Sequence, residues 1–307
     1  MKKGLFSVVF ASAMLGATTF AFAGAYGEAE QAEEIPAPLP AAVPTPEPPT
    51  PRAMHKFAGF LTDAETTHGL WVELDSMYGI HYYDHSGDFE AVNTDLHISY
   101  GKDLFEVGAL MPYLYVQQDH VSGDGASAFG DLRLWGKVMP VRTDIFTFGA
   151  GLVATFPTAG HDNGTHFGTN AYGFEPFLTV GVMAGPASIR YHAGYYVTTD
   201  PDTHRFDNLP NSDADDVFDR FDNNLGVLVP IGDMVVARAE IQHEHFTSEA
   251  VGSGDNDPVS IIPGADIYIG VGGDNELVIR PTVGVGLCDN APNWQAGLGI
   301  AFSANGI

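Results

Sequence analysis

The sequence predicts an all-β protein that crosses a membrane as an antiparallel barrel of about 12 strands. Three observations predict this fold. Apolar and polar residues alternate with period 2 from Leu70 onward, the connections are short and long in turn, and no stretch after residue 25 is apolar for the roughly 20 residues of a membrane helix. If the chain spans a membrane, it therefore does so with strands.

Composition excludes several other classes of protein. The chain has 13 Lys and Arg residues against 39 Asp and Glu residues, which argues against nucleic acid as a partner because phosphate binding needs clustered cations. The single Cys excludes a disulfide framework and a cysteine-built zinc site. We expect no cofactor and no metal.

Residues 1–23 have the pattern of a signal peptide. Lys2 and Lys3 precede an apolar run from Leu5 to Phe22, and Ala21-Phe22-Ala23 has the small-x-small pattern of a cleavage site. The alternative, an uncleaved membrane anchor, requires a longer apolar run. We therefore expect export and cleavage after Ala23.

Residues 24–59 form the next segment, which is rich in proline. Eight prolines fall between residues 28 and 52, and such a stretch favours an extended polyproline conformation that cannot bury a core. We interpret it as a semi-rigid periplasmic spacer, with recognition by a proline-binding partner as the alternative. The barrel then occupies residues 60–307.

The strand over residues 92–100 shows the alternation most clearly. Its apolar face carries Val92, Thr94, Leu96, Ile98 and Tyr100, and its polar face carries Asn93, Asp95, His97 and Ser99. The same division is clear over residues 70–83 and 235–244. Weaker versions occur at residues 104–116, 131–138, 144–156, 172–182, 187–197, 221–229, 265–271, 277–287 and 294–302.

The connections between these strands alternate in length. Short ones fall at residues 101–103, 139–143, 183–186, 230–233 and 272–275, and long ones at 84–90, 117–128, 157–170, 198–220 and 246–258. Outer-membrane barrels alternate tight periplasmic turns with long external loops, whereas a soluble sandwich has no reason to confine its insertions to one side. The pattern predicts the bacterial outer membrane as the location and its lipid as a partner.

Aromatic residues fall on the face that we predict to meet lipid, as in the girdles of such barrels. They include Tyr82, Tyr100, Tyr113, Tyr115, Tyr191, Tyr195, Trp294 and Phe302. The alternative is that they fill the core of a soluble β protein.

Four segments in order resemble the outer-membrane transporters named for the meta-pathway of phenol degradation. They are Leu61-Thr-Asp-Ala-Glu-Thr-Thr-His-Gly-Leu-Trp-Val-Glu-Leu74, Ile98-Ser-Tyr-Gly-Lys-Asp-Leu-Phe-Glu-Val-Gly108 leading to Met111-Pro-Tyr113, Phe129-Gly-Asp-Leu-Arg-Leu-Trp-Gly-Lys137, and Phe156-Pro-Thr-Ala-Gly160. The resemblance covers most of residues 60–302. It implies a porin-like barrel that admits small, often aromatic or apolar, compounds. Barrel-assembly machinery is a further expected partner, although the chain continues from Phe302 to Ile307 instead of ending on an aromatic residue.

The alternation also predicts which charged side chains face the lumen, because a charge facing lipid costs about 2–4 kcal/mol at the midplane for Arg or Lys. These predicted pore-lining residues are Asp75, Asp95, His97, Asp131, Arg133, Lys137, Glu175, Arg190, His192, Arg238, Glu240 and Arg280. Their mixed signs indicate a hydrogen-bonded lattice. These residues can contribute to solute selectivity or serve only as structural ion pairs, and the sequence does not distinguish the two roles.

The predicted function is a passive channel or transporter for a small-molecule solute. A closed, surface-exposed structural or binding barrel is the alternative. A lipid-active enzyme is a third hypothesis, since His97 and Ser99 share one strand face as a base and a nucleophile require, but that face is the lumenal one. The loop of residues 200–222 holds eight Asp, but it lacks the spacing of a twelve-residue calcium loop and is interpreted as a solvated acidic loop.

Overall fold

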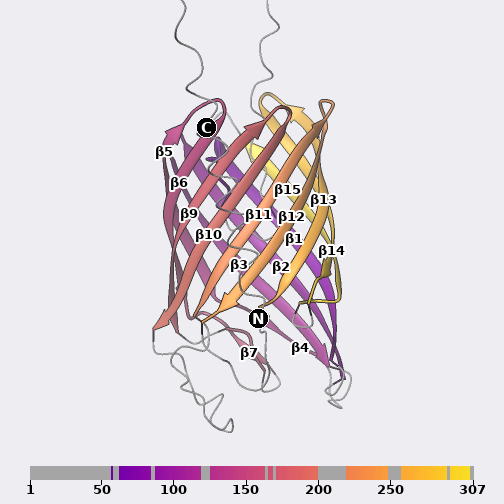
Figure 1. The fold of residues 1–307 in the computed structure, drawn as a ribbon. Helices are drawn as coiled ribbons and strands as arrows, with labels where there is room; N and C mark the ends of the chain where they lie inside the picture. Colours follow the sequence, from indigo (N-terminus) through magenta and orange to yellow (C-terminus); the bar gives the residue numbers. More distant parts are fainter. Residues whose placement is uncertain are drawn as a thin grey trace, which may run out of the picture. The chain divides into compact units, whose positions relative to one another are not determined.

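The chain folds into a closed antiparallel barrel of 12 strands (Figure 1), which confirms the predicted fold class. The computed structural model describes residue 57 and residues 62–83, 87–118, 125–162, 165–168, 171–199, 219–247, 257–288 and 291–304. The predicted signal peptide, the predicted spacer apart from Phe57, and residues 200–218 of the acidic loop lie outside these residues, as does the side chain of Tyr82. No helix in these ranges is long and apolar enough to cross a membrane.

The strands follow one another around the barrel in chain order. They are β1 (Gly69–Tyr83), β2 (Gly87–Lys102), β3 (Phe105–Gln118), β4 (Ala126–Phe129), β5 (Leu132–Arg142), β6 (Phe146–Phe156), β9 (Tyr172–Ala184), β10 (Ala187–Thr199), β11 (Arg220–Ile231), β12 (Val235–Phe246), β13 (Val259–Gly272), β14 (Asn275–Gly286) and β15 (Trp294–Ala304). A small separate hairpin consists of β7 (His161–Asp162) and β8 (Thr165–His166).

Pairing of the first and last strands closes the barrel. Leu74 of β1 lies opposite Ile300 of β15 on one side and opposite Leu96 of β2 on the other. Closure leaves no unpaired sheet edge, as a bilayer requires. The short turns at Gly185 and Gly232 adopt left-handed backbone conformations with φ of 63° and 64°, which glycine accommodates without strain.

β4 and β5 together form one strand of the barrel wall, interrupted at Gly130 and Asp131. Leu110 of β3 pairs with Arg133, whereas Tyr113 pairs with Phe129, so one extra residue bulges out of the β4–β5 segment. Ala126–Phe129 therefore belongs to the wall, although the sequence pattern placed residues 117–128 mostly in a loop.

Proline accounts for two strand boundaries that the sequence pattern misplaced. β5 continues through Pro140 to Arg142, and a register shift between Val138 and Val141 accommodates the missing N–H. β13 begins at Val259 and includes Pro263, so it is longer than the predicted 265–271. In both cases a residue that commonly ends strands lies within one.

The outward surface of the barrel is apolar. Large side chains exposed on this surface include Leu74, Leu96, Leu152, Leu178, Leu298 and Ile300, each between 42% and 52% exposed. The alternate residues of the same strands face inward and are mostly polar and buried. An apolar outer band around a polar interior is the arrangement of a transmembrane barrel.

Candidate functional site

The segment of residues 62–68, which precedes β1, lies inside the barrel and is called the plug here. Inward-facing side chains of five strands, β2, β3, β5, β6 and β10, hold it. Lys137 Nζ of β5 donates to the carbonyl oxygens of Asp63, at 2.6 Å, and of Glu65, while Thr147 Oγ1 of β6 donates to the Ala64 carbonyl at 2.7 Å. The plug sits near the end with the short turns, because Thr66 Oγ1 donates to the carbonyl of Asp103 in the β2–β3 turn.

Charged contacts strengthen this attachment. Arg190 of β10 forms a 2.7 Å ion pair with Glu65, and Glu106 of β3 accepts a 2.9 Å hydrogen bond from the backbone N–H of Thr67. Glu106 also lies 3.2 Å from Lys137 Nζ, and neither side chain is exposed. These contacts are charge-assisted, and the pair of Glu106 and Lys137 is also shielded from water, which makes it stronger than a surface pair.

Asp63 is fully buried within the plug. Burial raises the pKa of its carboxyl above the usual value, and the positive charges of Arg190 and Lys137 oppose the effect. The plug therefore contains one group whose protonation favours the buried position.

An ionic lattice covers the wall formed by β1, β12, β13 and β14. Arg238 pairs with Glu240 at 2.7 Å and with Asp266 at 3.1 Å. Arg280 pairs with the same Asp266 at 3.1 Å and with Glu73, which also accepts a 2.9 Å hydrogen bond from the Trp71 indole. Since both guanidinium groups share Asp266 and Arg280 also reaches Glu73, the lattice couples four strands.

Apolar side chains fill the lumen beside this lattice. Phe57 is 2% exposed and packs in a cluster with Trp71, Leu228, Val236, Tyr268, Val278 and Ala301. A second cluster joins Trp135, Val153 and Phe177, with Leu110 against it. Together with the plug, these residues close much of the lumen toward the short turns.

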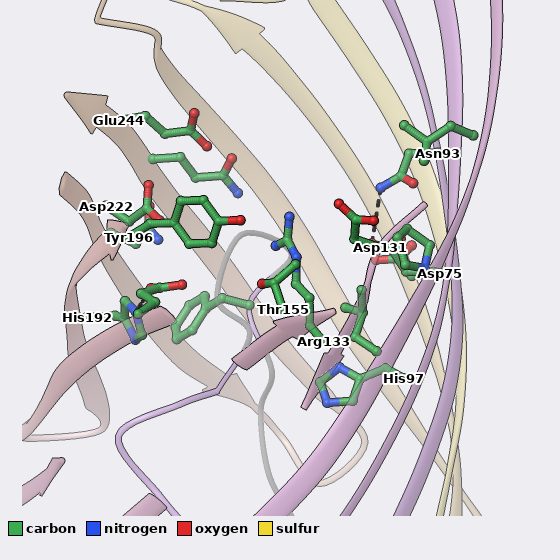
Figure 2. A pocket seen from close by; sticks show the side chains of 18 of the residues that line it. Asp75, Asn93, His97, Asp131, Arg133, Thr155, His192, Tyr196, Asp222 and Glu244 are labelled. Carbon is green, nitrogen blue, oxygen red and sulfur yellow. Dashed lines mark hydrogen bonds and ion pairs between the residues drawn. The ribbon is translucent and has the colours of Figure 1, made fainter. Parts of the chain in front are cut away.

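A cavity of about 470 Å³ remains inside the barrel, lined by strand residues closer to the long loops. Its lining includes Asp75 of β1, Asp95 of the adjacent β2, Arg133 of β5, His192 of β10 and Asp222 of β11. Asp75 lies across the cavity from His192 and Asp222 (Figure 2). The remaining lining residues are Phe57, Glu73, Asn93, His97, Leu110, Pro112, Leu114, Asp131, Thr155, Phe167, Gly168, Glu175, Tyr196, Arg220, Asn224, Gln242, Glu244 and Arg280.

The two walls differ in how their charges are paired. Arg220 lies 2.9 Å from Asp222 and 3.8 Å from Glu244, and its guanidinium lies over the Tyr196 ring, 4.8 Å from the ring centroid. On the opposite wall Asp95 accepts a 3.1 Å hydrogen bond from Asn93. Within the described ranges, Asp75 and Asp95 form no salt bridge, and one buried oxygen of each has no hydrogen-bond donor.

The twelve predicted pore-lining residues occupy three places in the barrel. Eight line the cavity, namely Asp75, Asp95, His97, Asp131, Arg133, Glu175, His192 and Arg280. Lys137 and Arg190 hold the plug, and Arg238 and Glu240 belong to the ionic lattice.

Sequence reasoning missed Glu106, Asp222, Glu244 and Asp266, although the same alternation places each of them on an inward face. It also missed Phe57 and the whole plug, which have no periodic pattern to indicate that they enter the barrel.

The serine–histidine pair is occupied with other contacts. Ser99 Oγ lies 3.1 Å from Thr67 Oγ1 of the plug, and the His97 ring packs edge-on against Trp135 with 4.6 Å between centroids. Both side chains are buried in the lumen, away from the lipid face. In the part of the chain that the structure describes, no group of three or more His, Cys, Asp or Glu side chains could hold a metal ion.

Comparison with known proteins identifies similar folds but no sequence family. No protein-family model and no curated protein matches the sequence. The fold is similar to the COG4313 outer membrane channel from Pseudomonas putida F1, with a TM-score of 0.57 and 12% identity over 78% of this chain and 96% of that chain.

Two more distant barrels are the KdgM porin and the CymD monoaromatic hydrocarbon channel. The KdgM match has a TM-score of 0.47 and 8% identity, and it covers 76% of this chain and 99% of that chain. The CymD match has a TM-score of 0.42 and 10% identity, and it covers 78% of this chain and 89% of that chain. The chain thus has the fold of a bacterial outer-membrane β-barrel.

Proposed function

We propose that this protein is a passive channel that admits small solutes across the bacterial outer membrane through its lumen. The observation that carries the proposal is the cavity of about 470 Å³ enclosed by the barrel wall and lined by charged side chains. A barrel that serves only as a membrane anchor needs no polar cavity in its lumen. The twelve predicted pore-lining residues would then bound the cavity, hold the plug and stiffen the wall.

The plug lies between the cavity and the end of the barrel with the short turns. In this proposal a solute entering from the long-loop side reaches the cavity first, and it passes the plug only when contacts such as Lys137 to Asp63 loosen. Conduction is therefore expected to be intermittent, and variants that weaken the plug should increase it.

Small aromatic or apolar compounds are the solutes that the resemblance to the meta-pathway transporters implies. Leu110, Pro112, Leu114 and Tyr196 give the cavity apolar surface that such compounds could contact. Barrel-assembly machinery stays an expected partner, since Phe302 lies near the end of β15 with its side chain exposed on the outer surface.

The buried contacts of the plug favour a second candidate, a closed structural or binding barrel. Swelling of proteoliposomes separates the two functions. Vesicles containing the chain without residues 1–23 should swell in isotonic arabinose faster than protein-free vesicles, and Lys137→Met should accelerate the swelling. Swelling at the protein-free rate with both proteins would support the closed barrel.

A further inference from the structure

The cavity has an excess of negative charge. Seven carboxylate side chains line it against three guanidinium groups. Charges enclosed by a barrel wall act in a medium of lower dielectric constant than bulk water, so this excess favours a cationic occupant.

Both walls carry an excess of carboxylates, but they differ in how the charges are paired. Arg280 pairs with Glu73, and Arg220 pairs with Asp222 on the opposite side. Asp75 and Asp95 lie directly opposite each other on β1 and β2, and across the described chain neither forms a salt bridge. Two adjacent carboxylates without a salt bridge among the described residues are thus available on this wall to a cationic ligand.

The hydrogen-bonding groups on this wall indicate the same kind of ligand. Asp75 Oδ1, Asp95 Oδ1 and Asn93 Oδ1 are buried acceptors without a donor among the described residues. Farther along the wall, the Thr155 side chain lines the cavity, is only 3% exposed, and has a hydroxyl with no partner in the same ranges. Buried nitrogens of Arg133 and Arg280, which also line the cavity, have no acceptor in these ranges either, but the three oxygens of Asp75, Asp95 and Asn93 outnumber them. An ammonium group offers three donors and no acceptor, which complements those three oxygens.

Apolar groups adjoin the carboxylates. Pro112 of β3 is the register partner of Asp95, and Leu110 and Leu114 line the cavity on either side of it. A ligand whose ammonium group meets Asp75 and Asp95 can therefore place an apolar body against β3. Inorganic cations have no such body.

We propose that the cavity binds small organic ammonium compounds, with Asp75 and Asp95 holding the charged group and the β3 side chains contacting the apolar body. As the solute class of the channel, this inference rests on the function proposed above. Arg133, which lines the same wall, opposes such a ligand by its like charge and limits its affinity.

Calorimetric titration of the full chain in a non-ionic detergent tests the inference with three probes that share one ring: benzylammonium, benzyl alcohol and benzoate. Benzylammonium should bind about tenfold more tightly than either other probe, because charge-assisted hydrogen bonds are stronger than neutral ones. Asp75→Asn with Asp95→Asn should remove that preference and leave benzyl alcohol binding unchanged. Asp233→Asn, which removes one negative charge from the exposed β11–β12 turn, should have no effect.

A variant that gains affinity guards against loss of folding as an explanation. Arg133→Gln should tighten benzylammonium binding about threefold or more, since it removes a like charge from the cavity wall. Equal affinity for the three probes, or a preference that survives loss of both carboxylates, would overturn the inference. Titration in detergent measures binding without requiring the ligand to pass through the barrel. Binding of benzylammonium without conductance would therefore reject only the channel. Conductance without preferential binding of benzylammonium would reject only the ammonium site.

Discussion

The attachment of the plug depends most on Lys137, which makes Lys137→Met the sharpest perturbation of the proposed pathway. The substitution keeps a side chain of similar length but removes two charge-assisted hydrogen bonds to plug carbonyls. Hydrogen bonds to charged groups contribute about 1.5–3 kcal/mol each, so docking of the plug should weaken by about 3 kcal/mol even at the lower value. That change raises the undocked fraction about 100-fold.

Thiol labelling measures this fraction directly. Ala64 is 1% exposed and lies in the plug, so Ala64→Cys should react with a membrane-impermeant thiol reagent only when the plug undocks. All labelling variants also carry Cys288→Ser, which removes the sole native cysteine and so leaves residue 64 as the one thiol that can react. Adding Lys137→Met should accelerate labelling about 100-fold, and adding Lys102→Met at the exposed end of β2 should not. Equal labelling rates in the two variants would refute the role assigned to Lys137.

Three further predictions test the wall and the plug. Gly108→Ala should lower the urea midpoint of unfolding, because the added Cβ would lie 2.0 Å from the Trp135 ring, whereas Gly136→Ala meets nothing within 4 Å and should be neutral. Leu96→Arg should destabilise insertion into vesicles by about 2–4 kcal/mol relative to Leu96→Ala, since the side chain faces lipid. Because the pKa of Asp63 is raised, docking of the plug should weaken as the pH rises through that pKa, so conductance should increase with pH and Asp63→Asn should abolish the dependence.

The barrel could be predicted from sequence because a strand has a fixed side-chain period. Asp95 and Leu96 are adjacent in the chain, yet one lines the cavity and the other is 42% exposed on the outer surface. A period of two residues requires that separation in any regular strand, and a lipid exterior makes the polarity of each face unambiguous.

The bulge at Gly130 could not be predicted in this way. An extra residue shifts the alternation by one position, and the pattern alone does not distinguish such a shift from the end of a strand. Pro140 and Pro263 obscured strand boundaries for another reason, since proline commonly ends strands and is tolerated within one only where its missing N–H is accommodated.

The plug lay beyond sequence reasoning for a different reason. Its position depends on contacts between residues far apart in the chain, such as Lys137 with the carbonyls of Asp63 and Glu65. Backbone carbonyls occur at every residue and leave no signature in the sequence. The alternation indicated that Lys137 faces inward, but it could not indicate what Lys137 binds.

Single-channel recording in planar bilayers tests the central claim, that the barrel is a passive channel, most directly. The chain without residues 1–23 should show discrete openings, and Lys137→Met should increase the open probability because a weakened plug exposes the cavity to both sides of the membrane. A current no greater than that of the bare bilayer for both proteins, with correct folding shown by their heat-modifiable migration, would contradict the channel and establish a closed barrel.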